Sequence, residues 1–231
     1  MPLKTLFFDA AGTLIRPAEP VGQTYAQHAR KHGLMAEEGA IMQAFRAVWK
    51  ETAPPLHPEG LPPEDDDRCW WRTLVGNVFG RVLGKPPGED VLDRLFDELY
   101  RHYAQPEAWS VFDDAVPALE KLAQDHRMLV LSNFDRRLRN ILAGHDLQRF
   151  FGQIIISSEV GAAKPHARMF QAALTAAGCL PHEALHIGDD VQCDLGGAQS
   201  CEIRAYHVKR PEMGLDGLVQ KVRSGAYSGL R

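Results

Sequence analysis

Five short apolar runs, widely separated along the chain, constrain the fold more than any other feature of the sequence. They are Leu3–Phe8, Met128–Leu131, Gln153–Ser157, Ala184–Ile187 and Ile203–Val208. Near-continuous apolar runs of this length are typical of strands buried on both faces of a parallel sheet. Helical spacing separates the last four runs, as in Phe170, Ala173 and Leu174. Strands that alternate with helices predict an α/β fold with a doubly wound parallel sheet.

The first run stands apart, because about a hundred residues separate it from the second, far more than an ordinary crossover contains. Apolar residues within this stretch recur at helical spacing in three sets. The sets are Ile41, Phe45, Val48 and Trp49; Trp71, Leu74, Val75, Val78 and Val82; and Leu92, Leu95, Phe96, Leu99 and Tyr103. An acidic, proline-rich connection, Ala53–Arg68, separates the first set from the second. We therefore expect an all-helical cap, residues 16–110, inserted into a core formed by residues 1–15 and 111–231.

The composition excludes several classes of protein. The 231 residues carry a net charge of −4, whereas nucleic-acid-binding surfaces usually show a basic excess. No apolar run approaches the ~20 residues that a membrane-spanning helix needs, and the first run reaches Asp9 too early for a signal peptide. We expect a cytoplasmic protein that acts on a small molecule, without a nucleic-acid or membrane partner. The sequence leaves the oligomeric state open.

Polar residues follow four of the predicted strands. They are Asp9 after the first run, Ser132 and Asn133 after the second, Lys164 beyond the third, and Asp189, Asp190 and Asp194 after the fourth. Each residue alone is also common as a turn former or helix cap. Ligands of open α/β sheets, however, bind beyond the carboxyl ends of the strands. Because an acid, a hydroxyl, a cation and an acidic cluster share this edge, the sequence predicts one functional site there.

These residues stand in motifs that resemble those of the haloacid dehalogenase (HAD) superfamily of hydrolases. The run Leu6–Leu14 is similar to the first HAD motif, an apolar strand that ends in a nucleophilic aspartate, here Asp9. Leu131-Ser132-Asn133 resembles the second motif, Lys164-Pro165 the third, and Ile187–Asp190 with Asp194 the fourth. The resemblance covers essentially the whole chain. It implies a Rossmann-like core with a helical cap between the first and second motifs.

The resemblance also implies a magnesium ion between the nucleophile and the acidic cluster. Asp9 and Asp189 would bind Mg²⁺ through their side chains, and Ala11 through its backbone carbonyl. Asp194 would contact the metal through water or support its ligands, and Asp190 is a further candidate ligand. Oxygen ligands suit magnesium. The cation would offset the repulsion between a carboxylate nucleophile and a phosphoryl group.

The same resemblance implies catalytic roles for Asp9, Ser132 and Lys164. Asp9 would attack the substrate, Ser132 would donate a hydrogen bond to a phosphoryl oxygen, and Lys164 would stabilise the developing charge. The residues expected to bind substrate are Gly12, Thr13, Ser132, Asn133 and Lys164.

At one position the sequence departs from the family pattern. Most HAD phosphatases carry a second aspartate two residues after the nucleophile, which protonates the leaving group and then activates water. This chain has Ala11 there, and general acid–base catalysis accelerates reactions about 10²–10⁴-fold. Three alternatives follow: a magnesium-dependent hydrolase that is slow or restricted to good leaving groups, a 2-haloacid dehalogenase or phosphonatase-like enzyme, or a non-catalytic relative that binds a phosphorylated ligand.

The sequence of the cap does not show a substrate pocket. His57, Arg68, Trp70 and Trp71 are candidates to face the substrate. Trp and Arg residues of a helical segment more often pack or lie at the surface. The sequence therefore leaves the identity of the substrate open.

Overall fold

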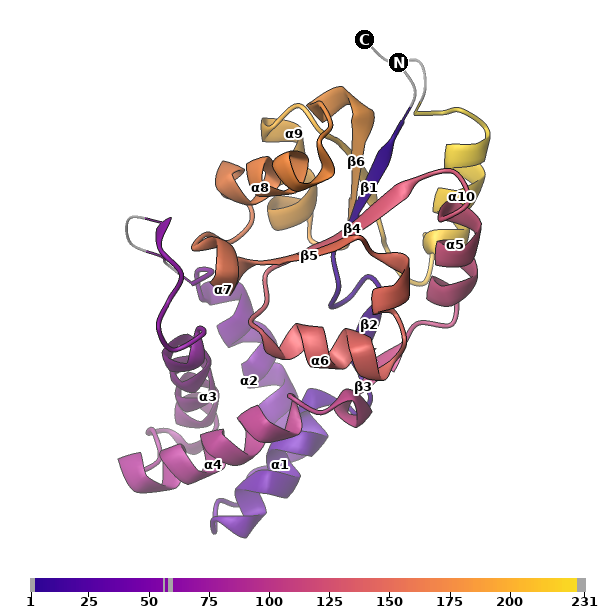
Figure 1. Cartoon of the computed structure of the whole chain (residues 1–231). Coiled ribbons are helices and arrows are strands. Elements are labelled where there is room, and N and C mark those ends of the chain that lie inside the picture. Colours follow the sequence, from indigo (N-terminus) through magenta and orange to yellow (C-terminus); the bar gives the residue numbers. More distant parts are fainter. Residues whose placement is uncertain (1–2, 56, 58–59, 228–231) are drawn as a thin grey trace.

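The chain folds around a five-stranded parallel sheet (Figure 1). The computed structural model describes residues 3–55, 57 and 60–227. The strands lie in the order β5-β4-β1-β6-β7. Their bounds are β1 (Thr5–Phe8), β4 (Arg127–Ser132), β5 (Gln153–Ile156), β6 (Ala184–Gly188) and β7 (Arg204–His207). The five predicted strands are confirmed, with ends that shift by at most two residues.

Helices cover both faces of the sheet, as the doubly wound arrangement requires. One face carries α5 (Ala115–Leu122), α6 (Arg137–Gly144) and α10 (Leu215–Arg223), and the other α8 (Ala167–Ala177) and α9 (Gly197–Ser200). Leu6 and Phe8 of β1 pack on the first face, and Phe7 packs on the second. Both faces are apolar because successive side chains of a strand point to opposite sides and both sides are covered.

Shorter helices complete the core. They are α7 (Ser157–Val160), a π-helical segment at Val191–Gly196, and three 3₁₀ turns at Pro106–Ala108, Gln148–Phe150 and Pro181–Glu183. The π-helical segment directly follows Asp190. π-Helical turns occur frequently at functional sites.

Parallel pairing brings the carboxyl ends of three strands to one level. Phe8 at the end of β1 pairs with Val130 of β4 on one side and with Ile187 of β6 on the other. The residues that follow these pairs are therefore neighbours in space. This is the edge at which the sequence places its polar motifs.

Four helices form a cap at this edge of the sheet (Figure 1). They are α1 (Val21–Lys31), α2 (Glu38–Glu51), α3 (Arg68–Leu83) and α4 (Glu89–His102). The cap buries its own apolar cluster, in which Leu74 and Phe79 of α3 are fully enclosed. The apolar spacing predicts α2, α3 and α4. It misses α1, because the buried face of α1 includes Ala26 and Ala29, which mark an apolar stripe only weakly.

A small antiparallel sheet, absent from the sequence prediction, joins the cap to the core. β2 (Ile15–Pro17) pairs with β3 (Trp109–Val111), and Ile15 lies opposite Val111. The chain thus leaves the core and returns to it through two neighbouring strands. Strands of three residues are too short to show the alternating pattern by which a strand is recognised in a sequence.

The connection between α2 and α3 contacts the core at a second place. Of the connection predicted at 53–68, residues 56, 58 and 59 lie outside the described part of the chain. Asp66 Oδ1 accepts a hydrogen bond from Ser158 Oγ at 2.6 Å, and its Oδ2 accepts one from the backbone N–H of Arg136 at 3.0 Å. A cap carboxylate is therefore bonded to the core beside the site.

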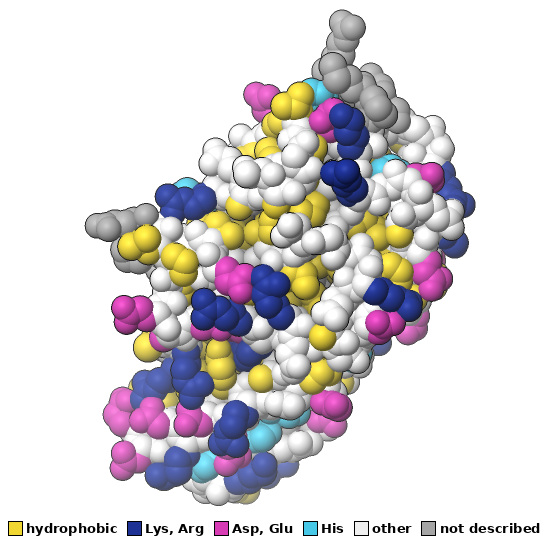
Figure 2. Space-filling model, viewed as in Figure 1, with side chains coloured by type: hydrophobic (Ala, Val, Ile, Leu, Met, Phe, Trp, Pro, Cys, Tyr) yellow, Lys and Arg dark blue, Asp and Glu magenta, His cyan; other side chains and the backbone are white. Residues whose placement is uncertain are grey.

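The surface mixes charges of both signs. On the face seen in Figure 2, acidic and basic side chains lie close together over the cap and the core. Within the described ranges, no helix combines the length and apolar character needed to cross a bilayer.

Candidate functional site

Asp9 directly follows β1 and is buried, with 6% of its surface exposed. The chain then turns at Gly12, where φ is +93°, a conformation that glycine adopts readily and other residues do not. A Cβ atom on Gly12 would lie 2.4 Å from Asp189 Oδ2. Glycine therefore allows the loop after the first strand to lie against the end of β6.

The ammonium group of Lys164 is the centre of the hydrogen-bond network. Lys164 Nζ donates to Asp9 Oδ1 at 2.8 Å, to Asp194 Oδ1 at 2.5 Å and to the carbonyl of Leu131 at 2.9 Å. A lysine has three N–H donors, and each has an acceptor here. Ser132 Oγ donates to Asp9 Oδ1 at 2.9 Å. The structure thus brings together Asp9, Ser132 and Lys164, the three residues that the sequence suggested as catalytic.

Asn133 fixes the loop that carries Lys164. Its Nδ2 donates to the backbone carbonyl of Lys164 at 2.8 Å, and its Oδ1 accepts from the backbone N–H of Lys164 at 2.6 Å. Both ends of the amide are engaged with the protein. The substrate contact predicted for Asn133 stays a prediction, whereas its hold on Lys164 is direct.

Asp194, in the π-helical segment, connects the Lys164 network to β6 and to the turn that follows β6. Its Oδ1 contacts His186 Nε2 at 2.8 Å, and its Oδ2 accepts the backbone N–H of Asp190 at 3.0 Å. Asp190 Oδ1 in turn accepts the N–H groups of Gln192 and Cys193, at 2.8 and 2.7 Å. Asp190 therefore caps the π-helical segment, and its role as a metal ligand stays a prediction. The sequence reasoning missed His186, although a lone polar residue inside an apolar strand is a signal for such a partner.

Thr13 supports Asp189. The Thr13 hydroxyl is buried and donates to Asp189 Oδ1 at 3.3 Å. Gly12 and Thr13 were predicted to bind substrate, and in the structure both lie against Asp189. Their substrate contacts stay predictions.

Three carboxylates converge at the edge of the sheet. Asp9, Asp189 and Asp194 offer oxygen atoms that all lie within 4.8 Å of one another. With one buried ammonium group among them, two negative charges remain uncompensated when all three are ionised. A divalent cation would balance these charges, and magnesium prefers oxygen ligands. The donor set and the charge both fit a magnesium ion, and Ala11 and Asp190 line the cavity beside the cluster.

The electrostatics of the four charged groups follow from this crowding. Burial raises the pKa of Asp9, against the charge and the hydrogen bond of Lys164. Loss of surrounding water, and then the charges of Asp9 and Asp194, raise the pKa of Asp189 to about 7, although this side chain is open to the cavity. Burial would lower the pKa of Lys164, but the charges of Asp194 and Asp9 outweigh it and raise that pKa. Burial likewise acts against the shift of Asp194, whose pKa Lys164 and His186 hold low. Lys164 and Asp194 thus form a stable ion pair, while Asp9 and Asp189 repel each other.

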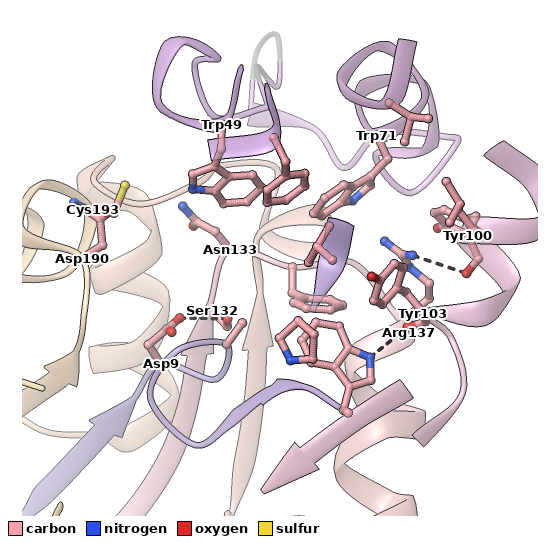
Figure 3. A pocket seen from close by; sticks show the side chains of 18 of the residues that line it. Asp9, Trp49, Trp71, Tyr100, Tyr103, Ser132, Asn133, Arg137, Asp190 and Cys193 are labelled. Carbon is pink, nitrogen blue, oxygen red and sulfur yellow. Dashed lines mark hydrogen bonds between the residues drawn. The ribbon is translucent and has the colours of Figure 1, made fainter. Parts of the chain in front are cut away.

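A cavity of about 320 Å³ lies between this edge and the cap, a volume typical of pockets for small organic ligands. Asp9 and Ser132 lie at its core end. Every cap helix contributes an aromatic ring to its walls: Tyr25 from α1, Trp49 from α2, Trp71 from α3 and Phe96 from α4. Figure 3 shows Trp49 and Trp71 on the cap side, across from Asn133 and Ser132. The reacting end of the cavity is polar and the rest is largely aromatic.

Arg137 is a cavity residue that the sequence reasoning missed. Its guanidinium forms a two-point ion pair with the fully buried Asp135, through Nε at 2.8 Å and Nη2 at 2.6 Å. The group lies 3.7 Å from the ring centre of Tyr100 and 5.3 Å from that of Trp71. Asp135 follows the end of β4 by three residues, and the arginine two residues later was the available signal.

Of the four cap candidates named from the sequence, Trp71 lines the cavity. The indole of Trp70 donates to the carbonyl of Ala53 at 3.0 Å, Arg68 pairs with Asp97, and His57 lies 3.7 Å from Asp67. These three residues do not line the cavity. The sequence therefore indicated one of the aromatic residues that line the cavity, Trp71.

Residues 3–201 match the family model of the haloacid dehalogenase-like hydrolases. The chain belongs to this family. A mouse relative, haloacid dehalogenase-like hydrolase domain-containing protein 3, is 33% identical over 213 residues, which cover 92% of this chain and 84% of the mouse protein. The human protein of the same name is 33% identical over 221 residues, covering 95% and 87%. The resemblance drawn from the four motifs is confirmed.

Solved structures of the family share the fold. YfnB from Bacillus subtilis, solved bound to magnesium, superimposes with a TM-score of 0.71 at 16% identity and covers 96% of this chain and 99% of its own. The L-2-haloacid dehalogenase from Xanthobacter autotrophicus gives a TM-score of 0.68 at 23% identity, covering 96% and 83%. These likenesses confirm a Rossmann-like core with a helical cap. They do not distinguish phosphoryl transfer from dehalogenation.

Proposed function

We propose that this protein is a magnesium-dependent hydrolase that removes a phosphoryl group from a small molecule, with Asp9 as the nucleophile. The observation that carries the proposal is the group of three carboxylates, Asp9, Asp189 and Asp194, whose oxygens lie within 4.8 Å of one another. Without a bound cation, the negative charge of these three carboxylates would repel an anionic substrate. A divalent cation at this place would instead attract one.

The residues around Asp9 support its role as the attacking group. The bonds from Ser132 and Lys164 both end on Asp9 Oδ1 and fix the orientation of the carboxylate. Oδ2 receives no hydrogen bond from the described residues and is free to engage a ligand. For Ser132 or Lys164 to donate to a phosphoryl oxygen, its hydrogen bond to Asp9 Oδ1 would have to pass to that oxygen as negative charge develops.

The same edge offers the ligands for the metal. Asp9, Asp189 and the backbone carbonyl of Ala11 would hold magnesium, with Asp194 and Asp190 supporting them directly or through water. Bound there, the ion would offset the repulsion between the carboxylate and the phosphoryl group. In this proposal residues 1–15 and 111–231 form the catalytic core, and residues 16–110 form the cap that encloses the substrate.

Magnesium binding tests the proposal directly. Calorimetric titration should show one magnesium site, and Asp189→Asn should weaken it at least about tenfold, because the variant removes a charged ligand. Asp113→Asn, an exposed carboxylate outside the cavity, is the matched control and should leave the affinity unchanged. Hydrolysis of acetyl phosphate should require magnesium. Equal affinity in the wild type and in Asp189→Asn would contradict the assignment.

Dehalogenation is the second candidate, and Ala11 is the observation that favours it. A halide departs without a proton, so a dehalogenase needs no acid at this position. The carboxylate cluster counts against this candidate, since dehalogenation in the family proceeds without metal. Release of halide from 2-haloacids in the presence of EDTA would decide for dehalogenation over phosphoryl transfer.

A further inference from the structure

We propose that the substrate is an aryl phosphate, in which the oxygen that leaves phosphorus is bonded to an aromatic ring. This inference rests on the proposed function and names the substrate class of the same site. Two independent observations lead to it: the aromatic walls of the cavity, and the absence of an acid beside the leaving group.

The first observation is an exposed aromatic surface inside the cavity. Trp49 is 47% exposed, although it lines the cavity and is surrounded by other rings. Its indole stacks on Phe45 with ring centres 5.9 Å apart and lies 6.0 Å from Trp71. Because Phe45, Trp49 and Trp71 all line the cavity, a ligand in it would lie against these rings. Aromatic rings favour stacked or edge-to-face contacts with other rings, whereas the hydroxyl groups of a sugar phosphate would lose their hydrogen bonds against such walls.

Arg137 holds these walls in place. Its guanidinium is fixed by the two bonds to buried Asp135 and lies over the rings of Tyr100, Trp71 and Phe134, at 3.7, 5.3 and 5.8 Å. Guanidinium groups stack favourably on aromatic faces. These three rings are thus held in place before a ligand enters. A flat, rigid group fills such a preformed cavity at a small cost in conformational entropy.

The second observation concerns the leaving group. Ala11 lines the cavity at the position from which the family's second aspartate protonates the leaving oxygen. The other carboxylates of the cavity are engaged: Asp194 bonds to Lys164, Asp190 caps the turn that follows it, and Asp189 would hold the magnesium ion of the proposed function. The leaving oxygen must therefore depart as an anion. A phenolate spreads its charge over the ring and departs far more readily than an alkoxide, since phenols such as tyrosine ionise near a pKa of ~10.

The reaction balances without an added acid. A carboxylate oxygen of Asp9 forms a bond to phosphorus, the bond between phosphorus and the aryl oxygen breaks, and its electron pair leaves with the phenolate. The phenolate then takes a proton from solvent. Water next attacks phosphorus, the bond to Asp9 breaks, and inorganic phosphate leaves while the proton of the water passes to solvent.

Four substrates separate the two requirements, which are an aromatic ring and a good leaving group. Phenyl phosphate has a ring and a good leaving group, benzyl phosphate a ring and a poor one, acetyl phosphate a good leaving group without a ring, and propyl phosphate neither. With magnesium present, kcat/KM for phenyl phosphate should exceed that for benzyl phosphate at least about 100-fold, because no acid assists the alkoxide. Propyl phosphate should be the poorest substrate of the four.

A pair of cap variants tests the walls. Trp49→Leu should raise KM for phenyl phosphate about three- to tenfold and raise KM for acetyl phosphate less, because acetyl phosphate carries no ring. Met35→Ala removes an exposed apolar side chain of the cap that does not line the cavity and should change neither. Benzyl or propyl phosphate turned over as fast as phenyl phosphate would overturn the aryl phosphate proposal, as would a Trp49→Leu variant with unaltered KM. If acetyl phosphate is not hydrolysed either, the proposed phosphatase function itself fails.

Discussion

The two ends of the cavity are built on different principles. At the core end, charged groups are held by hydrogen bonds: the three donors of Lys164 have acceptors, and both oxygens of Asp194 are engaged. At the cap end, rings are held by packing, and the indole of Trp49 remains half exposed. The first region fixes the orientation of a few atoms, and the second provides a shaped apolar surface.

This difference separates reaction from selection. Hydrogen bonds and ion pairs impose narrow distances and angles, so the core end suits bond making and breaking. Stacked rings tolerate small displacements, so the cap end suits the recognition of a class of ligands. Changes at the core end should therefore alter turnover, and changes at the cap end should alter which substrate is preferred.

The largest expected effect is at the core end. Asp9→Asn removes the proposed nucleophile, so acetyl phosphate hydrolysis should fall by more than about 1,000-fold. Steady-state assays with saturating magnesium measure the loss, and thermal unfolding serves as the control for folding. A variant that keeps a tenth of the activity would show that a different group attacks phosphorus.

The ion pair of Arg137 and Asp135, which lies between the core end and the cap end, should have the largest effect on the free energy of unfolding. Arg137→Leu leaves buried Asp135 without its partner and should lower the free energy of unfolding by about 3–5 kcal/mol. Arg139 lies on the same helix and pairs with Glu159 at the surface. Arg139→Leu should therefore cost no more than about 1 kcal/mol. Urea denaturation measures both, and similar losses would mean that the Arg137–Asp135 pair does not support the cavity.

Adding an acid at position 11 should reduce the difference in turnover between substrates with poor and with good leaving groups. Ala11→Asp places a carboxyl group where the leaving oxygen departs. It should raise kcat for benzyl phosphate about tenfold, which is about 1.4 kcal/mol of barrier, and raise that for phenyl phosphate less. Magnesium affinity and thermal stability of the variant must first match the wild type. A folded, magnesium-binding variant that gains nothing on benzyl phosphate would weaken the phosphatase proposal.

The smallest expected effect concerns Asp67, a buried residue of the cap just before α3. Burial, and then the negative charges of Asp135, Asp66 and Asp65, raise the pKa of Asp67 to about 7. An acid whose pKa is higher in the folded than in the unfolded state binds more protons when folded, so stability falls as pH rises from about 4 to 7. The wild type should therefore unfold at a lower urea concentration at pH 8 than at pH 5.5.

A pair of neighbouring variants isolates this effect. Asp67→Asn stays neutral and should unfold at nearly the same urea concentration at pH 5.5 and pH 8. Glu64→Gln is the control, because Glu64 is exposed and is not among the groups whose charges raise the pKa of Asp67, and this variant should keep the wild-type pH dependence. An unchanged pH profile in Asp67→Asn would assign the effect to another group.

The sheet was predictable because its strands are buried on both sides, and such strands have continuous apolar runs in the sequence. The elements that the sequence analysis missed have weaker signals in the sequence. β2 and β3 have three residues each, and α1 buries alanines that hardly mark a stripe. The π-helical segment depends on the hydrogen bonds that Asp190 makes to the backbone, and no periodicity in the sequence encodes these bonds.

The candidate site divides in the same way. Asp9, Ser132, Lys164 and Asp189 follow strand ends, so parallel pairing alone brings them to one edge. Arg137 and Trp49 belong to helices whose rotation and approach are set by tertiary packing. Their helical spacing shows which residues share a helix face, but it does not show that two helices leave a space between them. The residues that meet at the core end could therefore be predicted, and the shape of the cap end could not.

The junction between the two regions has a consequence for how such a protein diversifies. The chain leaves the core at Ile15 and returns at Val111, and these two residues face each other in the pair of β2 and β3. The cap is an insertion whose ends are adjacent, so its length and helices can change while the register of the main sheet stays as it is. Ligand preference and reaction machinery can then be inherited separately, one by replacement of an inserted module and the other by retention of a few strand ends.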